Sequence, residues 1–345
     1  MEKSDLIWQP SHEKINLFLD NVIKQVFPHA RFASSLMIGS PDVAPNSFDG
    51  VLSPENLFKD TLYEYNGSGK FIHYTSLLGL NSILDNGWLR MSEFRNLIDQ
   101  NELLYASKVF SDNQLFTPQI ETLNRVKDNI FCLSACEATD ETKTDSYLWE
   151  VYGDKGKGVF IEYEFSDPKP YHHIFGKVRY GDLELAQLRN LKSLFEEFRN
   201  THSNFSPGKF IELILEAQAF HKSDKYSSEK EVRMLLRVDK QQYEEHNDIK
   251  IYQDINSKQE IRYFSKLFLK GRHSFLTKEN IEKIGLKNII KITPQIEIKK
   301  VVLGFNVSIE NKVEIMYFLQ KVKKLHNYEF ELWHLNDEKK FIKMF

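Results

Sequence analysis

Cysteine is scarce in this sequence: Cys132 and Cys136 are the only two among 345 residues. Their spacing fits neither a CxxC redox motif nor a tetrahedral zinc site, which would need further Cys or His ligands nearby. We therefore interpret both as reduced packing residues and expect no metal site.

Long apolar runs and an excess of basic residues are also lacking. No segment approaches the roughly 18 consecutive apolar residues that a membrane helix needs, and the first residues lack the pattern of a signal peptide. The net charge of -3 gives no general reason to expect nucleic acid or acidic lipid as a partner, although local basic patches are compatible with it. We expect a cytoplasmic protein without a membrane partner.

What the sequence does contain is typical of a large packed core. It is 41% hydrophobic and includes 26 Phe and 15 Tyr. Apolar spacing and capping residues predict helices at 11–27 and 54–65, so residues 1–65 are expected to form a helical N-terminal extension that packs on the main domain or on a protein partner. Residues 66–345 would form the main domain.

The main domain begins with a strand that carries a polar pair. In Phe71-Ile72-His73-Tyr74-Thr75-Ser76, a strand-like run leads to Ser76, a good N-cap for a helix that ends at Asn86-Gly87. A histidine beside a capped helix is how binding sites are often built. The alternative is a hydrogen-bonded core histidine.

A second polar group follows another predicted strand. Ile130 to Ser134 reads as a strand, Glu137 to Thr144 as a polar loop, and Asp145 to Tyr152 as a short capped helix. The glycine loop at 153–158 lacks a GK[ST] ending and leads into a strand at 159–165 rather than a helix, which argues against a phosphate loop.

The third motif is acidic. Glu229, Glu231 and Arg233 alternate, so on a strand all three side chains would point to one face. The alternative is a solvated face with self-paired charges. Elsewhere the pattern predicts strands at 174–180, 261–270, 298–304, 328–333 and 341–345, with helices at 181–199, 207–221 and 307–324.

These motifs occur in an order that resembles a widespread bacterial domain family of unknown function. The resemblance covers about residues 70–345 and rests on HYTS at 73–76, the acidic and amide loop ending in Glu102, FCLS at 131–134, SxxWxxY at 146–152 with the strand that follows Gly158, YxxExExR at 226–233 and the strand Val301 to Gly304. More distantly, the family resembles the ADP-ribosyltransferase superfamily. That resemblance implies an α+β fold with a mixed, split β-sheet around an NAD site.

The same resemblance implies roles for individual residues. Glu231 would be the catalytic carboxylate, with Glu229 as the other acid of the motif, and a fixed carboxylate beneath the sugar would stabilise the oxocarbenium-like transition state. The cofactor-binding residues would be His73 with its neighbours Tyr74 and Thr75, and Ser134, Trp149, Tyr152 and Arg233. Two alternatives stay open here: Trp149 and Tyr152 could be core residues, and Arg233 could simply pair with Glu231.

We therefore expect an NAD-consuming enzyme, most simply a mono-ADP-ribosyltransferase of a bacterial toxin or defence type with NAD as its substrate. Its acceptor would be an unidentified protein or nucleic acid. Two alternatives are an NAD glycohydrolase and a catalytically silent interaction module with the same fold. A nuclease or metal hydrolase is disfavoured because no compact His/Asp ligand cluster is evident.

Overall fold

The structure is a computed structural model, and it describes residues 16–31, 52–96, 102–110, 127–165, 173–202, 216–238, 251–255, 260–270 and 294–345. The chain separates into two compact units. Unit 1 comprises residues 1–65, 94–130 and 172–227, and unit 2 comprises residues 66–93, 131–171 and 228–345. The N-terminal 65 residues therefore belong to a unit that also contains two later segments of the chain.

Unit 1 is mainly helical and aromatic. Phe18, next to the π-helix η1 (Leu19–Ile23), packs edge-on against Phe195 and Phe198 of helix α7 (Ala186–Thr201). The remaining elements of this unit are short: η2 (Phe94–Asn96), α3 (Glu102–Ser107), β5 (His173–Lys177), β6 (Arg179–Tyr180), η4 (Leu183–Leu185) and β7 (His221–Lys222).

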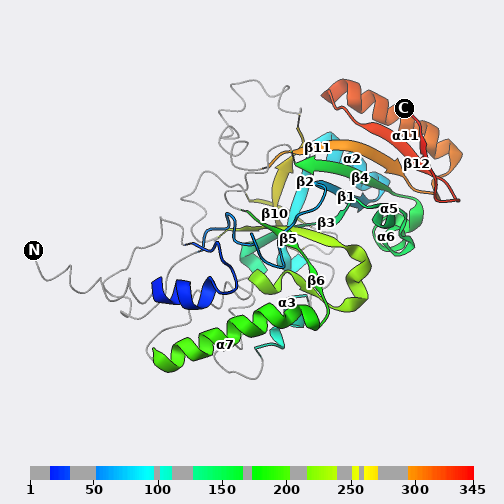
Figure 1. The fold of residues 1–345 in the computed structure, drawn as a ribbon. Coiled ribbons are helices and arrows are strands. Elements are labelled where there is room, and N and C mark those ends of the chain that lie inside the picture. Colours follow the sequence, from blue (N-terminus) through cyan, green and yellow to red (C-terminus); the bar gives the residue numbers. More distant parts are fainter. Residues whose placement is uncertain are drawn as a thin grey trace, which may run out of the picture. The chain divides into compact units, whose positions relative to one another are not determined.

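Unit 2 is built on a large mixed sheet (Figure 1). Its strands lie in the order β13-β12-β11-β4-β1-β3-β2-β10-β9, and β8 (Glu231–Arg237) also pairs with β3. Strands β11 and β12 are parallel, whereas the other pairs along this order are antiparallel. The bounds are β1 (Lys70–Thr75), β2 (Trp88–Glu93), β3 (Ile130–Glu137), β4 (Val159–Phe165), β9 (Tyr252–Ile255), β10 (Ile261–Phe268), β11 (Ile296–Leu303), β12 (Glu331–Leu335) and β13 (Phe341–Lys343).

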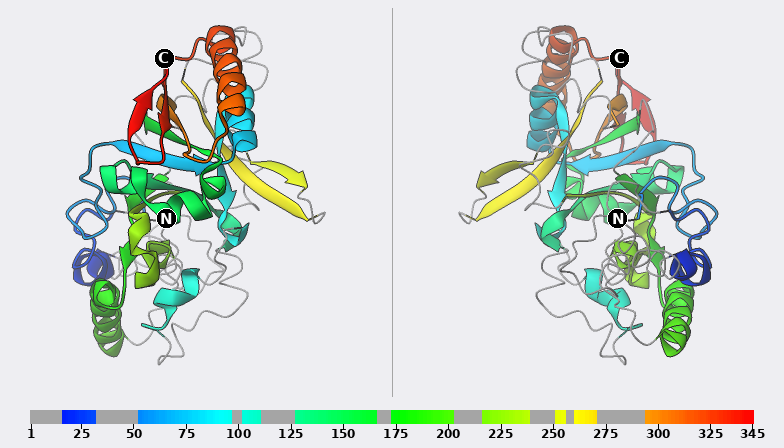
Figure 2. Two further views of the ribbon diagram at one scale, coloured as in Figure 1. Left: turned by 90° about the vertical axis from the view of Figure 1, so that its right-hand side faces the viewer. Right: turned by 90° about the vertical axis from the view of Figure 1, so that its left-hand side faces the viewer.

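Capped helices connect these strands. Helix α2 (Leu77–Asn86) starts at Ser76, whose hydroxyl accepts from the Gly79 amide, and ends at Gly87 in the left-handed conformation. Helix α11 (Ile309–His326) starts at Ser308 in the same way. The Tyr328 hydroxyl, just after α11, donates to the Leu84 carbonyl of α2, and the two helices lie side by side in Figure 2.

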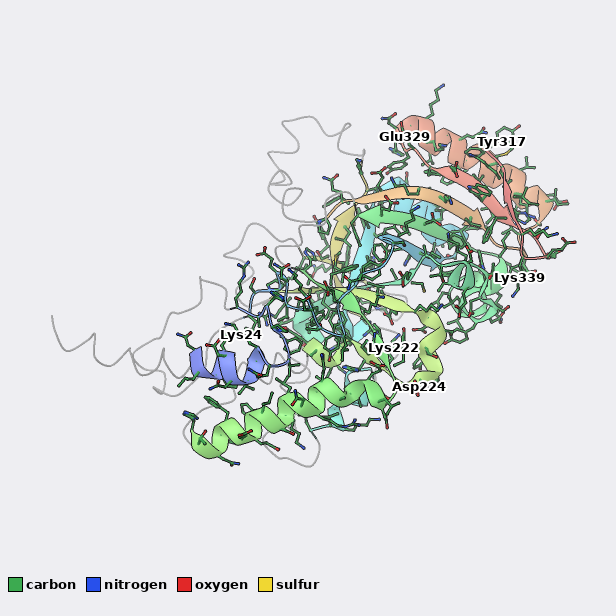
Figure 3. All side chains as sticks on the ribbon, viewed as in Figure 1. Lys24, Lys222, Asp224, Tyr317, Glu329 and Lys339 are labelled. Atoms are coloured by element: carbon green, nitrogen blue, oxygen red, sulfur yellow. The ribbon has the colours of Figure 1, made fainter. Side chains whose placement is uncertain are left out.

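Two short helices cover one face of the sheet. They are α5 (Asp140–Thr144) and α6 (Ser146–Val151), and Trp149 of α6 belongs to a buried cluster with Ile72, Tyr74, Phe160 and Val302 from three strands. We call this side of the sheet face A. The turn between β12 and β13 also reaches these helices, because Lys339, labelled in Figure 3, donates to the Ser146 hydroxyl at 3.0 Å.

Most predicted elements are present, so the predicted α+β class with a mixed sheet is confirmed. Two predictions were wrong. Residues 54–65 form turns rather than a helix. The segment 137–144, predicted as a loop, contains α5, because Thr139 and Thr142 form a reciprocal capping box. The first part of the predicted helix at 11–27 and most of that at 207–221 lie outside the described residues.

Candidate functional site

Glu229 does not lie on the strand that carries Glu231. It ends the 3₁₀ helix η5 (Asp224–Glu229), and the next residue, Lys230, has a φ of 42°, which interrupts the extended backbone before β8 begins. The predicted alternation of three side chains on one strand face is therefore wrong at its first member. Only Glu231 and Arg233 follow it.

The break at Lys230 brings Glu229 to helix α6. Tyr152 directly follows α6, and its hydroxyl donates a 2.8 Å hydrogen bond to Oε1 of Glu229. Lys230 in turn makes an ion pair with Glu141 of α5. The SxxWxxY and YxxExExR motifs, which lie far apart in the sequence, thus meet in the structure.

Glu231 and Arg233 form a buried ion pair. Nε of Arg233 donates to Oε1 of Glu231 at 2.7 Å and Nη2 donates to Oε2 at 3.2 Å, while the exposed fractions of the two side chains are 0% and 5% for Arg233 and Glu231. Glu229 is buried as well. The alternative of a solvated face with self-paired charges is therefore wrong about the solvent, because the side chains are buried, but right about the pairing, because Arg233 pairs with Glu231.

Strand β3 separates the strand of His73 from the strand of Glu231. At its end, the Ala138 amide donates to the Lys70 carbonyl of β1, whereas the Glu137 amide donates to the Lys230 carbonyl on the other edge. The last residue of β3, Glu137, is thus bonded to Lys230, the residue just before β8. Strand β8 pairs with β3 and must therefore run antiparallel to it. Glu137 is opposite Lys230 in this ladder. Three residues back along β3 and three forward along β8, Ser134 is opposite Arg233, and both side chains are on face A.

His73 lies on the opposite face. Ile72 and Tyr74 contribute to the cluster on face A, against which Tyr152 also packs, so His73 between them points to the other side. It is partly exposed, and no hydrogen-bond partner of its ring lies among the described residues. Burial lowers the pKa of His73 to about 4, so the imidazole is neutral at pH 7. The sequence predicted that His73 and Glu231 would face one cleft, with Trp149 or Tyr152 on its wall. This prediction is wrong, because His73 projects from the face opposite to that of Glu231 and Tyr152.

Tyr74 and Trp149 pack in the buried cluster on face A. The Tyr74 hydroxyl donates to the Thr142 carbonyl, and its ring meets Trp149 edge-on at 5.1 Å. Thr75 shares the face of His73. Trp149 is completely buried and donates from its indole to the Lys143 carbonyl at 3.0 Å. Of the two aromatic residues in the motif, Trp149 is thus a core residue and Tyr152 is the one that reaches the acids.

The glycine loop packs around Trp149. A Cβ added at Gly153 would lie 2.6 Å from the indole ring, and one added at Gly158 would lie 2.3 Å from the Thr75 carbonyl. These glycines are therefore explained by close approach of side chain and backbone, without a phosphate.

Glu162 is among the buried charged residues that were not singled out from the sequence. Glu162 of β4 is 2% exposed and lies on face A between two lysines, with Nζ of Lys143 at 2.8 Å and Nζ of Lys300 at 3.5 Å. A glutamate in the middle of the apolar run 159–163 was the available signal. We interpret it as a structural ion cluster that ties α5 to the sheet.

Metal and membrane features are not found in the part of the chain that the structure describes. No group of three or more His, Cys, Asp or Glu side chains in these residues could hold a metal ion. No helix among them has both the length and the apolar composition needed to cross a membrane.

A family model matches part of the chain. Residues 148–234 match the family described as "Protein of unknown function (DUF2971)", which is about a quarter of the chain. The matched segment starts within α6 and ends in β8, so it contains Trp149, Tyr152, Glu229, Glu231 and Arg233. No curated protein and no solved structure gave a significant match.

Proposed function

We propose that unit 2 binds NAD and cleaves its nicotinamide–ribose bond at the acids Glu229 and Glu231, transferring ADP-ribose to an acceptor. The observation that carries this proposal is the hydrogen bond from Tyr152 to Glu229 beside the Glu231–Arg233 pair. It gathers two buried carboxylates, an arginine and a half-buried aromatic residue at one end of β8.

The chemistry requires a carboxylate whose position is fixed. When nicotinamide leaves with the bonding electron pair, positive charge develops on the ribose, and a preorganised carboxylate stabilises that charge more than it stabilises the substrate. The two donors of Arg233 hold Glu231 in one orientation, and the Tyr152 hydroxyl orients Glu229. Glu231 is therefore the proposed catalytic carboxylate, with Glu229 as the second acid.

The remaining ligands come from the same face. Ser134, partly exposed on β3, would contact the ribose or phosphate, and Tyr152 would pack against a ring of the substrate. His73 has no part in this site, because it projects from the other face. The bacterial toxin or defence setting is part of the proposal and rests on the resemblance to ADP-ribosyltransferases.

A second function is favoured by one specific observation. Both carboxylate oxygens of Glu231 already accept from Arg233, so much of its charge is compensated within the protein. The same arrangement would suit a catalytically silent interaction module in which the acids only stabilise the fold. If water is the acceptor instead of a macromolecule, the same site would act as an NAD glycohydrolase.

The test is to incubate the full chain with NAD, with and without cell lysate, and to measure nicotinamide release by mass spectrometry. Glu231→Gln keeps the size of the side chain but removes its charge, so turnover should fall by about 100-fold or more while NAD affinity changes little. Glu338→Gln is the matched control, since Glu338 is exposed and pairs only with Lys340 in the described structure.

Three other outcomes are informative. Loss of turnover in Glu229→Gln but not in Glu231→Gln would move the catalytic role to Glu229. Weaker NAD binding by His73→Ala, by the 1 to 3 kcal/mol typical of an unpaired buried group, would contradict the face assignment made above. If the wild-type chain neither binds NAD nor releases nicotinamide, the silent module replaces the enzyme as the proposed function.

A further inference from the structure

Face A carries a second cluster at the β9 edge of the sheet, which the proposed NAD chemistry does not use. Strands β2, β10 and β9 are adjacent there, and their side chains alternate so that Leu89, Met91 and Leu267 are buried on the opposite face. We call the residues that share face A the aromatic–cation face: Trp88, Arg90, Tyr252, Asp254, Phe264 and Lys266.

Three rings of this face form a row across the three strands. The ring centroids of Trp88 and Phe264 are 5.4 Å apart at an interplanar angle of 24°, and those of Phe264 and Tyr252 are 5.7 Å apart at 25°. Trp88 and Tyr252 are only partly buried, whereas Phe264 between them is buried, so the two outer rings are the accessible ones. Nearly parallel, partly exposed rings on a sheet surface are platforms on which planar groups can stack.

Cations alternate with these rings. The Arg90 guanidinium lies 4.2 Å from the Phe264 centroid, and Nζ of Lys266 lies 3.7 Å from that of Tyr252 and 4.7 Å from that of Trp88. Arg262 adds a third cation on the same face, since it is directly opposite Asp254 in the β9–β10 ladder. Asp254, which pairs with Arg90 at 2.7 Å, is the one carboxylate among these named residues.

Two of the cations face each other without a carboxylate between them in the ladder. Arg90 and Lys266 are directly paired across β2 and β10. Like charges at such positions destabilise a sheet. Burial, and next the charge of Arg90, lower the pKa of the Lys266 ammonium, which is the electrostatic sign of that cost. Asp254 compensates Arg90 from one side, and an anion bound beside Lys266 would compensate the charge that is left.

We propose that the aromatic–cation face binds single-stranded nucleic acid, with bases stacked on Trp88 and Tyr252 and phosphates held by Arg90, Lys266 and Arg262. A single strand is specified because stacking on these rings needs bases that are not already stacked in a duplex. The excess of positive groups at this face complements a phosphate backbone, although the whole chain has a net charge of -3. Adjacent strands lie about 4.8 Å apart, so three strands offer room for two or three nucleotides.

The test uses the full chain and fluorescence anisotropy with a short fluorescein-labelled oligothymidylate, an oligouridylate and a DNA duplex of equal length. We expect single strands to bind at least tenfold more tightly than the duplex. The comparison of the two single strands identifies which nucleic acid is preferred. Lys266→Gln should weaken binding and reduce the slope of log Kobs against log salt by about 0.7, the value for one phosphate contact on a single strand.

Lys343→Gln is the matched control. Lys343 also lies near a tryptophan ring, at 5.9 Å from that of Trp333, on β13 at the other edge of the sheet. Its substitution should leave oligonucleotide binding unchanged.

Lys266→Glu separates binding from folding. It replaces the repulsion with Arg90 by an attraction but also removes the contacts of Nζ with the Tyr252 and Trp88 rings, so the variant should melt close to the wild type and yet bind oligonucleotide at least tenfold more weakly. The proposal is overturned if the wild type does not bind single strands at about 50 mM salt. It is equally overturned if the duplex binds as tightly, or if the Lys266 variants bind like the wild type. None of these readouts depends on NAD cleavage.

Discussion

Tyr152 donates its hydroxyl hydrogen to Oε1 of Glu229 at 2.8 Å, joining the end of helix α6 to the residue that ends η5. Glu229 is buried and Tyr152 half-buried, so this bond lies mostly away from water. It connects the two motifs that the sequence places 77 residues apart. This bond fixes the position of the Glu229 carboxylate relative to α6.

Tyr152→Phe should therefore destabilise the protein. The substitution removes the donor but leaves the carboxylate buried, which typically costs about 1 to 3 kcal/mol. Urea denaturation measures the loss. A double-mutant cycle with Glu229→Gln assigns it to this contact, because the two changes should be less than additive. Additive effects would mean that the hydroxyl stabilises the protein through another partner.

Arg233→Met tests the buried ion pair. With Arg233 absent, Glu231 would remain buried without its bidentate partner, and the loss of one member of such a pair costs about 3 to 5 kcal/mol. The double variant Arg233→Met with Glu231→Gln should recover part of this loss in urea denaturation. Lys340→Met, which removes an exposed pair with Glu338, should change stability by less than about 1 kcal/mol. Equal effects of the two methionine variants would contradict the assigned burial.

The sequence predicted the elements well but not the direction of their side chains. Alternating apolar residues were sufficient to place most of the strands, and cap residues such as Ser76 and Ser308 placed helix starts, because both signals are local. The pairing of both β1 and β8 with β3 was not among these predictions.

Three features of the site could not be predicted in this way. The left-handed backbone of Lys230, which turns Glu229 away from the strand, is not encoded by a glycine or asparagine. The face on which His73 lies depends on which neighbours become core, a property of the whole sheet. The aromatic–cation face joins β2 to strands β9 and β10, more than 150 residues later in the chain, and only the ladder register shows that Arg90 meets Lys266.

Gly304→Ala tests the explanation of the glycine loop. A Cβ at this position would lie 2.2 Å from the Gly156 carbonyl oxygen and 2.9 Å from the Trp149 ring. Because neither the loop backbone nor a fully buried indole can move freely, we expect a loss of about 1 to 3 kcal/mol in urea denaturation. Lys157→Ala, in the glycine loop at 153–158, should leave both stability and NAD affinity unchanged. Loss of nucleotide binding by Lys157→Ala would instead support a phosphate-binding loop.

The pH dependence of stability tests the environment of His73. Burial lowers its pKa to about 4 in the folded protein, compared with 6.5 for an ordinary histidine. As the pH falls from 6.5 towards 4, the unfolded chain therefore binds a proton that the folded chain does not, and the free energy of unfolding decreases. The slope contributed by this group is at most about 1.4 kcal/mol per pH unit, and the total is at most roughly 3 kcal/mol, less where solvent reaches the ring.

His73→Gln keeps a polar side chain but removes this titration. The free energy of unfolding of the wild type minus that of the variant, measured by urea denaturation between pH 7.5 and 4, should therefore decrease as the pH falls. His221 in unit 1 also has a pKa lowered to about 3 by burial and by Arg179, but it contributes equally to both proteins and cancels in the difference. A difference that stays constant over this range would show that the His73 ring is solvated in the folded state. In that case its side of the sheet, rather than face A, would become the surface to search for a ligand.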